Sequence, residues 1–134
     1  MNRTEYLKLD DFTRAYITAA LWSSNDESTP QGGEPFDVNY DENDIAPETI
    51  AKMLTDCKAF QRDNAELLEQ VPDTGREWSA AEQSGHDFWL TRNGHGAGFW
   101  DRGYGELGDK LTEACKAYRE VDLYLGDDGQ IYGA

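Results

Sequence analysis

The chain has 134 residues, with 27 acids against 12 bases and a formal net charge of −15. Its length is typical of one domain, and an apolar fraction of 38% with 12% aromatic residues excludes a disordered chain. We expect no direct contact with nucleic acid, because phosphates repel a surface of this charge.

Cysteines and hydropathy indicate the compartment. Cys57 and Cys115 lie far apart in amphipathic helical patterns, where a cysteine behaves as a small hydrophobe. We therefore expect free thiols in a reducing compartment. The first residues lead to no apolar run of the signal-peptide type, and no stretch approaches the roughly 20 apolar residues of a membrane span. The sequence thus predicts a cytoplasmic protein that binds no membrane.

The first predicted element is a helix from about Asp10 or Asp11 to Trp22. Its apolar residues recur at every third and fourth position and form one stripe. Asp10 is a suitable N-cap residue. The stripe consists of Phe12, Ala15, Tyr16, Ala19 and Trp22.

A long acidic loop is predicted over residues 23–46. It lies within a stretch from Tyr16 to Ala51 that contains no Lys or Arg. Phe36, Val38 and Tyr40 alternate, which indicates a short strand or a loop pinned to the core. Loops of this length in a compact domain are usually functional or mobile. The acids of the stretch are Asp26, Glu27, Glu34, Asp37, Asp41, Glu42, Asp44 and Glu48.

The second predicted helix begins near Asp44, a cap candidate, and carries Pro47 in its first turn. Its apolar stripe predicts an end near Gln70, before Pro72. Further along, the capping-box pattern from Ser79 to Glu82 indicates the start of one helical turn.

A β-hairpin is predicted over residues 86–101, because Asn93-Gly94 is a strong two-residue turn signal. In this register Phe88 pairs with Phe99 on the core face. Trp89 and Trp100 fall on the opposite face.

The third predicted helix spans about residues 106–119, and a second hairpin follows. This hairpin runs from Val121 to Leu125, turns at residues 126–129 and returns through residues 130–132. The order of elements predicts one domain over residues 1–134, of the α+β class. In it, three helices pack on a small, mainly antiparallel sheet built from the two β-hairpins.

Residues 85–103 carry a distinctive segment, GHDFWLTRNGHGAGFWDRG. It resembles a signature of small acidic proteins encoded by tailed bacteriophages, prophages and mobile elements. The resemblance continues through residues 105–108 and 127–129, and covers roughly the C-terminal half. It implies a phage gene acting in a host cell, and no particular activity.

A nucleotide or metal site has only weak support. Residues 103–108 match the spacing G-x-G-x-x-G between a predicted strand and a predicted helix. However, Glu106 would lie in the phosphate turn, with Asp101 and Asp109 nearby, and would repel a pyrophosphate. His86 and His95 lack a third ligand at a defined spacing. We therefore expect no cofactor, no metal and no catalytic residue.

The tip of the first predicted hairpin is a candidate binding surface. Exposed aromatic residues beside an arginine are typical of protein-binding hot spots. The alternative is that both tryptophans pack under a helix. The candidate residues are Trp89, Arg92, Asn93, His95 and Trp100.

These observations favour a non-enzymatic phage protein that binds and inhibits or modulates a basic, nucleic-acid-handling host protein. In an anti-defence or host-takeover role, its acids would imitate part of the charge of DNA. The predicted contacts are the acids from Asp26 to Glu48, the acids of the C-terminal half and the tip residues. Alternatives are a small enzyme or nucleotide-binding module centred on residues 85–108, and a virion structural or assembly protein. The sequence also leaves open whether the protein forms a homodimer.

Overall fold

The computed structural model describes residues 1–28, 30, 32–73, 77–94 and 98–134. Within them the chain forms helices α1 (Arg3–Leu7), α2 (Asp11–Ser23), α3 (Pro47–Asp63), α4 (Ala65–Glu69), α5 (Ala80–Arg92) and α6 (Glu106–Cys115). Two short antiparallel ladders join β1 (Asn25–Asp26) to β2 (Glu34–Pro35), and β3 (Leu123–Leu125) to β4 (Ile131–Gly133). The 3₁₀ turns are η1 (Phe36–Val38), η2 (Glu42–Asp44) and η3 (Phe99–Asp101).

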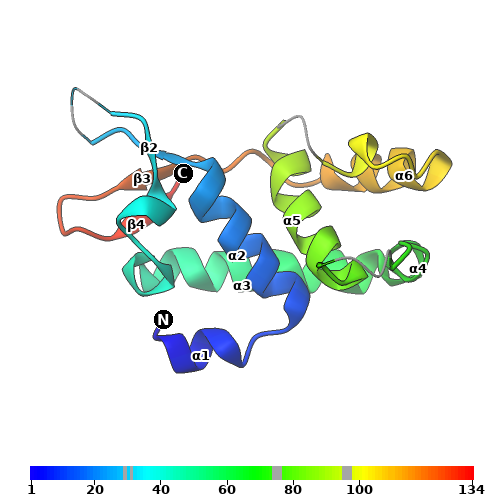
Figure 1. Cartoon of the computed structure of the whole chain (residues 1–134), viewed down its shortest axis with the longest axis horizontal. Coiled ribbons are helices and arrows are strands. Elements are labelled where there is room, and N and C mark those ends of the chain that lie inside the picture. Colours follow the sequence, from blue (N-terminus) through cyan, green and yellow to red (C-terminus); the bar gives the residue numbers. More distant parts are fainter. Residues whose placement is uncertain (29, 31, 74–76, 95–97) are drawn as a thin grey trace.

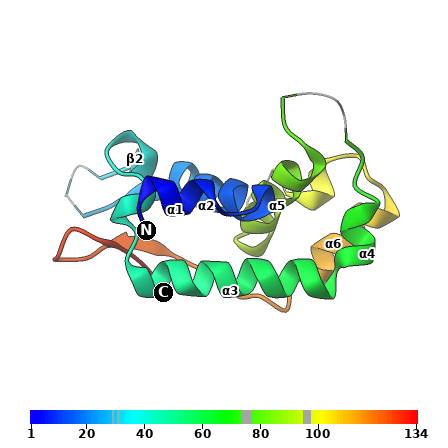
Figure 2. The same ribbon diagram turned by 90° about the horizontal axis from the view of Figure 1, so that it is seen from below.

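The helices form two layers, and the ladders lie at one end. Figure 2 shows α3 below, with α1, α2 and α5 above it. The ladders lie at one end of the molecule, and α4 and α6 lie at the other (Figure 1). The predicted α+β class is confirmed. The arrangement of three helices on one sheet built from two hairpins is wrong, because the described strands form two separate pairs among six helices.

Local signals explain α2 and the start of α3. Asp10 caps α2 by accepting a hydrogen bond of 2.8 Å from the Thr13 backbone N–H, as predicted. Pro47 occupies the first turn of α3. The helix ends at Asp63, where the Asn64 side chain donates to the Phe60 carbonyl at 3.0 Å. The single helix predicted to reach Gln70 is therefore divided into α3 and α4.

The prediction of a hairpin over residues 86–101 is wrong, because residues 80–92 form α5. Ser79 and Glu82 make a complete capping box at its start. Asn93 is the C-cap, and Gly94 follows with a φ of +70°, the left-handed conformation that ends many helices. Asn-Gly therefore terminates a helix here instead of turning a hairpin.

The sequence of α5 lacks the amphipathic period that identifies a helix, because α5 is buried on every side. Each residue from Ser84 to Leu90 is buried, so no polar face breaks the pattern. Gly85 makes this possible, since it lies where α5 crosses α2. A Cβ atom at this position would lie 1.9 Å from the Phe12 carbonyl oxygen.

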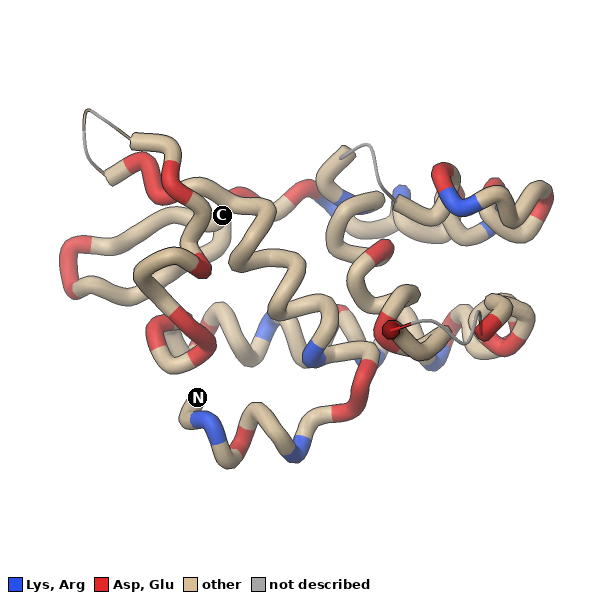
Figure 3. Tube along the Cα trace, in the orientation of Figure 1, with Lys and Arg blue, Asp and Glu red and all other residues tan. Residues whose placement is uncertain are grey.

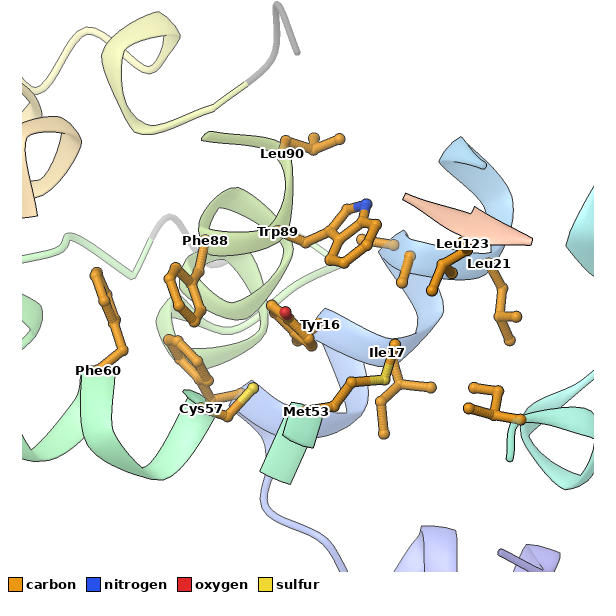
Figure 4. Packing of buried hydrophobic residues seen from close by; sticks show 14 of the residues in the cluster. Tyr16, Ile17, Leu21, Met53, Cys57, Phe60, Phe88, Trp89, Leu90 and Leu123 are labelled. Carbon is orange, nitrogen blue, oxygen red and sulfur yellow. The ribbon is translucent and has the colours of Figure 1, made fainter. Parts of the chain in front are cut away.

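An aromatic core joins α2, α3 and α5. Phe60 of α3 stacks on Phe88 of α5 at 4.1 Å between ring centroids, and Tyr16 of α2 meets Trp89 edge-on at 5.3 Å (Figure 4). All four rings are almost completely buried. Burial of side chains of this size stabilises a fold by roughly 1.5–3 kcal/mol each.

The predicted C-terminal hairpin is present as β3 and β4, with Leu125 opposite Ile131. The region predicted as a loop contains β1, β2, η1 and η2, and its Phe36 is buried. α6 ends at Cys115, four residues before the predicted position.

No helix in the described ranges combines the length and apolar character needed to cross a membrane.

Candidate functional site

Two segments without bases meet at the end of the molecule that carries the ladders. Residues 15–51 and 120–134 contain no Lys or Arg, and together hold twelve acids. β1 contacts β3, Ile45 pairs with Ile131 in a parallel bridge, and the Ala46 N–H donates to the Ile131 carbonyl at 2.9 Å. We call residues 24–48 and 120–134 the hairpin end. Acids predominate there in Figure 3.

The remainder of the chain is close to neutral. It holds fifteen acids and all twelve bases, a net charge of −3 against −12 for the two base-free segments. Most acids of the hairpin end face solvent, so their charge is available to a partner. The exposed ones are Glu27, Glu34, Asp37, Asp41, Glu48, Glu120, Asp122, Asp127 and Asp128.

Three predicted contact acids are less accessible. Asp26 and Asp44 are half-buried, and Glu42 is buried. Glu42 accepts a hydrogen bond of 2.9 Å from Arg3, which neutralises its charge. Glu42 therefore fastens α1 to η2 and is not available to a partner.

Hydrogen bonds hold several carboxylates in place. Asp41 and Asp44 form a reciprocal capping box across η2. Asp128 accepts a hydrogen bond of 2.6 Å from the Tyr132 hydroxyl, which lowers the pKa of Asp128 and raises the pKa of Tyr132 to about 12. Hydrogen bonds within short turns therefore fix the positions of the Asp41, Asp44 and Asp128 carboxylates.

The predicted tip residues do not form one surface. Trp89 is buried, and its indole N–H donates to Ser23 Oγ at 2.7 Å. Trp100 is 53% exposed, and Asn93 is half-buried as the cap of α5. The prediction for His95 lies outside the described residues. Packing of Trp89 inside the protein agrees with the alternative interpretation for that residue.

Arg92 is buried in an ion pair, and so is not available to a partner. Its Nη1 donates to Asp56 Oδ2 at 2.8 Å and to the Tyr16 hydroxyl at 3.1 Å. Its Nε and Nη2 both donate to the Arg119 carbonyl. The Asp56 side chain is 6% exposed and also pairs with Lys52. Arg92 therefore ties α5 to α3 and to the segment that leads into β3.

The glycines of residues 103–108 make a tight connection between η3 and α6. Gly103 and Gly105 have φ angles of +72° and +62°. A Cβ atom on Gly108 would lie 2.9 Å from the Phe99 carbonyl oxygen. The element before this connection is a 3₁₀ turn and not the predicted strand, so the strand–turn–helix context of a dinucleotide site is missing.

Among the residues that the structure describes, no three His, Cys, Asp or Glu side chains are grouped as metal ligands. Both cysteines are free and buried. Burial raises the pKa of Cys57 well above its ordinary value and that of Cys115 to about 12, which disfavours the reactive thiolate form.

Comparison with models of protein families, with curated proteins and with solved structures finds no match to this chain.

The sequence prediction included the acids of the C-terminal half only as a group, without naming the four that lie at the hairpin end. Glu120, Asp122, Asp127 and Asp128 lie in the last fifteen residues, which contain no base. That stretch is visible in the sequence, but its position beside residues 24–48 depends on long-range packing through Ile45 and Ile131.

Proposed function

We propose that this protein is non-enzymatic and binds a basic, nucleic-acid-handling protein through its hairpin end, as a partial mimic of nucleic acid. The observation that carries the proposal is the meeting of two base-free segments with twelve acids at one end of the fold. With Glu42 neutralised by Arg3, eleven charges remain. Duplex DNA carries two charges per base pair, so eleven correspond to roughly five or six base pairs.

Charge of one sign at one end favours a particular mode of recognition. It attracts a cationic surface from a distance and raises the association rate, and it repels nucleic acid and other acidic proteins. The resemblance of residues 85–103 to phage proteins supports a target in a bacterial host, with a role in anti-defence or host takeover. Such a target would be occupied by this protein in place of DNA or RNA.

The proposal is tested by capture from a bacterial lysate at two salt concentrations, with and without added duplex DNA. Three exposed acids are neutralised together at the hairpin end as Glu27→Gln, Asp37→Asn and Glu48→Gln. A matched control neutralises Glu66→Gln, Glu69→Gln and Asp109→Asn at the other end of the molecule. Both sets are exposed and remove equal charge.

We expect the wild-type protein to capture a basic protein that added duplex DNA displaces and that high salt releases. The hairpin-end variant should lose most of this capture, and the control variant should keep it. Equal loss in the two variants, or capture that is insensitive to duplex DNA, would contradict the proposal.

A further inference from the structure

His86 lies between two tryptophans, and the hollows that it lines include no residue of the hairpin end. Trp22 of α2 stacks on its ring at 5.5 Å between centroids, and Trp78 meets it edge-on at 4.7 Å. The His86 side chain is only 8% exposed, whereas Trp22 and Trp78 are 40% and 37% exposed. Two partly open aromatic residues therefore enclose one almost buried imidazole.

Asp87 holds one ring nitrogen of this imidazole. Its completely buried carboxylate accepts hydrogen bonds from Arg102 at 2.7 Å and from Gln83 at 3.0 Å. His86 Nδ1 lies 3.1 Å from the same carboxylate. Since a carboxylate only accepts, Nδ1 donates to it, and in the neutral tautomer of the ring Nε2 is the hydrogen-bond acceptor.

Nε2 is the ring nitrogen that remains for a ligand. Among the described residues it has no hydrogen-bond partner, and His86 lines two adjoining hollows of about 530 Å³ and 400 Å³. The larger hollow falls within the size range of roughly 300–1,000 Å³ that is usual for small-molecule sites. A nearly buried imidazole whose Nδ1 is bound to Asp87 thus lines a cleft.

The larger hollow favours a cation. Trp78 and Tyr104 contribute aromatic surface, and the exposed carboxylates of Glu77 and Asp101 lie among its lining residues. Arg102 is the one base among the described lining residues, and its guanidinium is bound to the Asp87 carboxylate. Aromatic faces and carboxylates both attract positive charge, and Nε2 requires an N–H donor.

We infer that the cleft beside His86 binds an organic cation with N–H donors, of the guanidinium or ammonium type. One N–H donates to His86 Nε2, the cationic group packs against Trp78, and Glu77 and Asp101 balance its charge. The cation is either a free small molecule or a side chain of a partner protein. This binding site is independent of the hairpin end, so failure of one proposal leaves the other intact.

The test uses the His95→Gln variant, in which His86 is the only histidine. Long-range proton–nitrogen NMR spectra of the labelled protein report which ring nitrogen carries the proton. Agmatine serves as the guanidinium probe and putrescine as the ammonium probe, with butylurea as a neutral control. A capped Gly-Arg-Gly peptide distinguishes a protein side chain from a free small molecule.

We expect the proton on Nδ1, and a saturable shift of the Nε2 signal with at least one cationic probe but not with butylurea. A shift with agmatine or putrescine alone assigns the cleft to small molecules, and a shift with the peptide assigns it to a protein side chain. A proton on Nε2, an equal response to butylurea, or no response to any cationic probe would overturn the inference.

Surface variants keep the test independent of folding. Glu77→Gln combined with Asp101→Asn should weaken probe binding about tenfold, because two carboxylates near the cation are lost. Glu66→Gln combined with Glu69→Gln removes the same charge on α4 and should leave the affinity unchanged. Equal affinities for the two double variants would count against the cleft as the binding site.

Discussion

The hairpin end and the helical core of this molecule are built on different principles. In the core, rings such as Phe60 and Phe88 stack face to face, and a buried arginine pairs with a buried aspartate. In the hairpin end, strands of two or three residues each bury a single large side chain or none. The core carries opposite charges in pairs, whereas the hairpin end carries charge of one sign. Stability is therefore concentrated in one region and surface charge in the other.

The largest expected effect comes from the crossing of α2 and α5. Gly85→Ala places a methyl group against the Phe12 carbonyl, at a site where the backbone has to move. We expect the free energy of unfolding to fall by about 2–3 kcal/mol. Chemical denaturation measures the loss. Ala81→Ser, at an exposed position of the same helix, is the control and should change stability by less than about 0.5 kcal/mol. Equal effects of the two substitutions would show that the crossing is not tightly packed.

The ion pair between Arg92 and Asp56 is the next most sensitive feature. Arg92→Met leaves the Asp56 carboxylate buried with Lys52 as its remaining ion-pair partner among the described residues. We expect it to cost about 3 kcal/mol, because the buried carboxylate loses its buried partner and keeps only the exposed Lys52. Arg92→Met combined with Asp56→Leu should be more stable than the sum of the two single losses predicts. A double-mutant cycle measures this coupling, and strictly additive losses would exclude a strong interaction.

The smallest expected effect lies in the hairpin end, at Asp128. The hydrogen bond from Tyr132 lowers the pKa of Asp128 in the folded protein below its value in the unfolded chain. Its contribution to stability is therefore present above the unfolded pKa, and is lost as the pH falls through the folded pKa. Tyr132→Phe should raise the pKa of Asp128 towards its ordinary value, which an NMR titration of the carboxyl carbon measures. An unchanged pKa would show that the hydroxyl does not stabilise the charged form.

Local signals made α2 and the C-terminal hairpin predictable. The Asp10 cap and the apolar stripe of α2 depend only on residues close together in the sequence. The same is true of the turn before Gln130. α5 was missed because it is buried on every side, so it shows no amphipathic period. Its capping box at Ser79 was visible, but the Asn93-Gly94 pair suggested a different end for the segment.

The candidate site was predictable only as a composition. The acids from Asp26 to Glu48 follow from the sequence, since no base interrupts them. The burial of Trp89 and Arg92 does not follow from the sequence. It depends on Ser23, Tyr16 and Asp56, which lie far from them along the chain. The pairing of Glu42 with Arg3 likewise joins distant residues.

The bridge between Ile45 and Ile131 has a consequence for the order of folding. It closes a loop that spans most of the chain, and it brings together two segments that repel each other. Such a contact is slow to form, because the loss of chain entropy and the repulsion both precede the gain from burial. We expect the helices to assemble first and the two acidic segments to dock last. Added salt should then accelerate this final step by screening the repulsion.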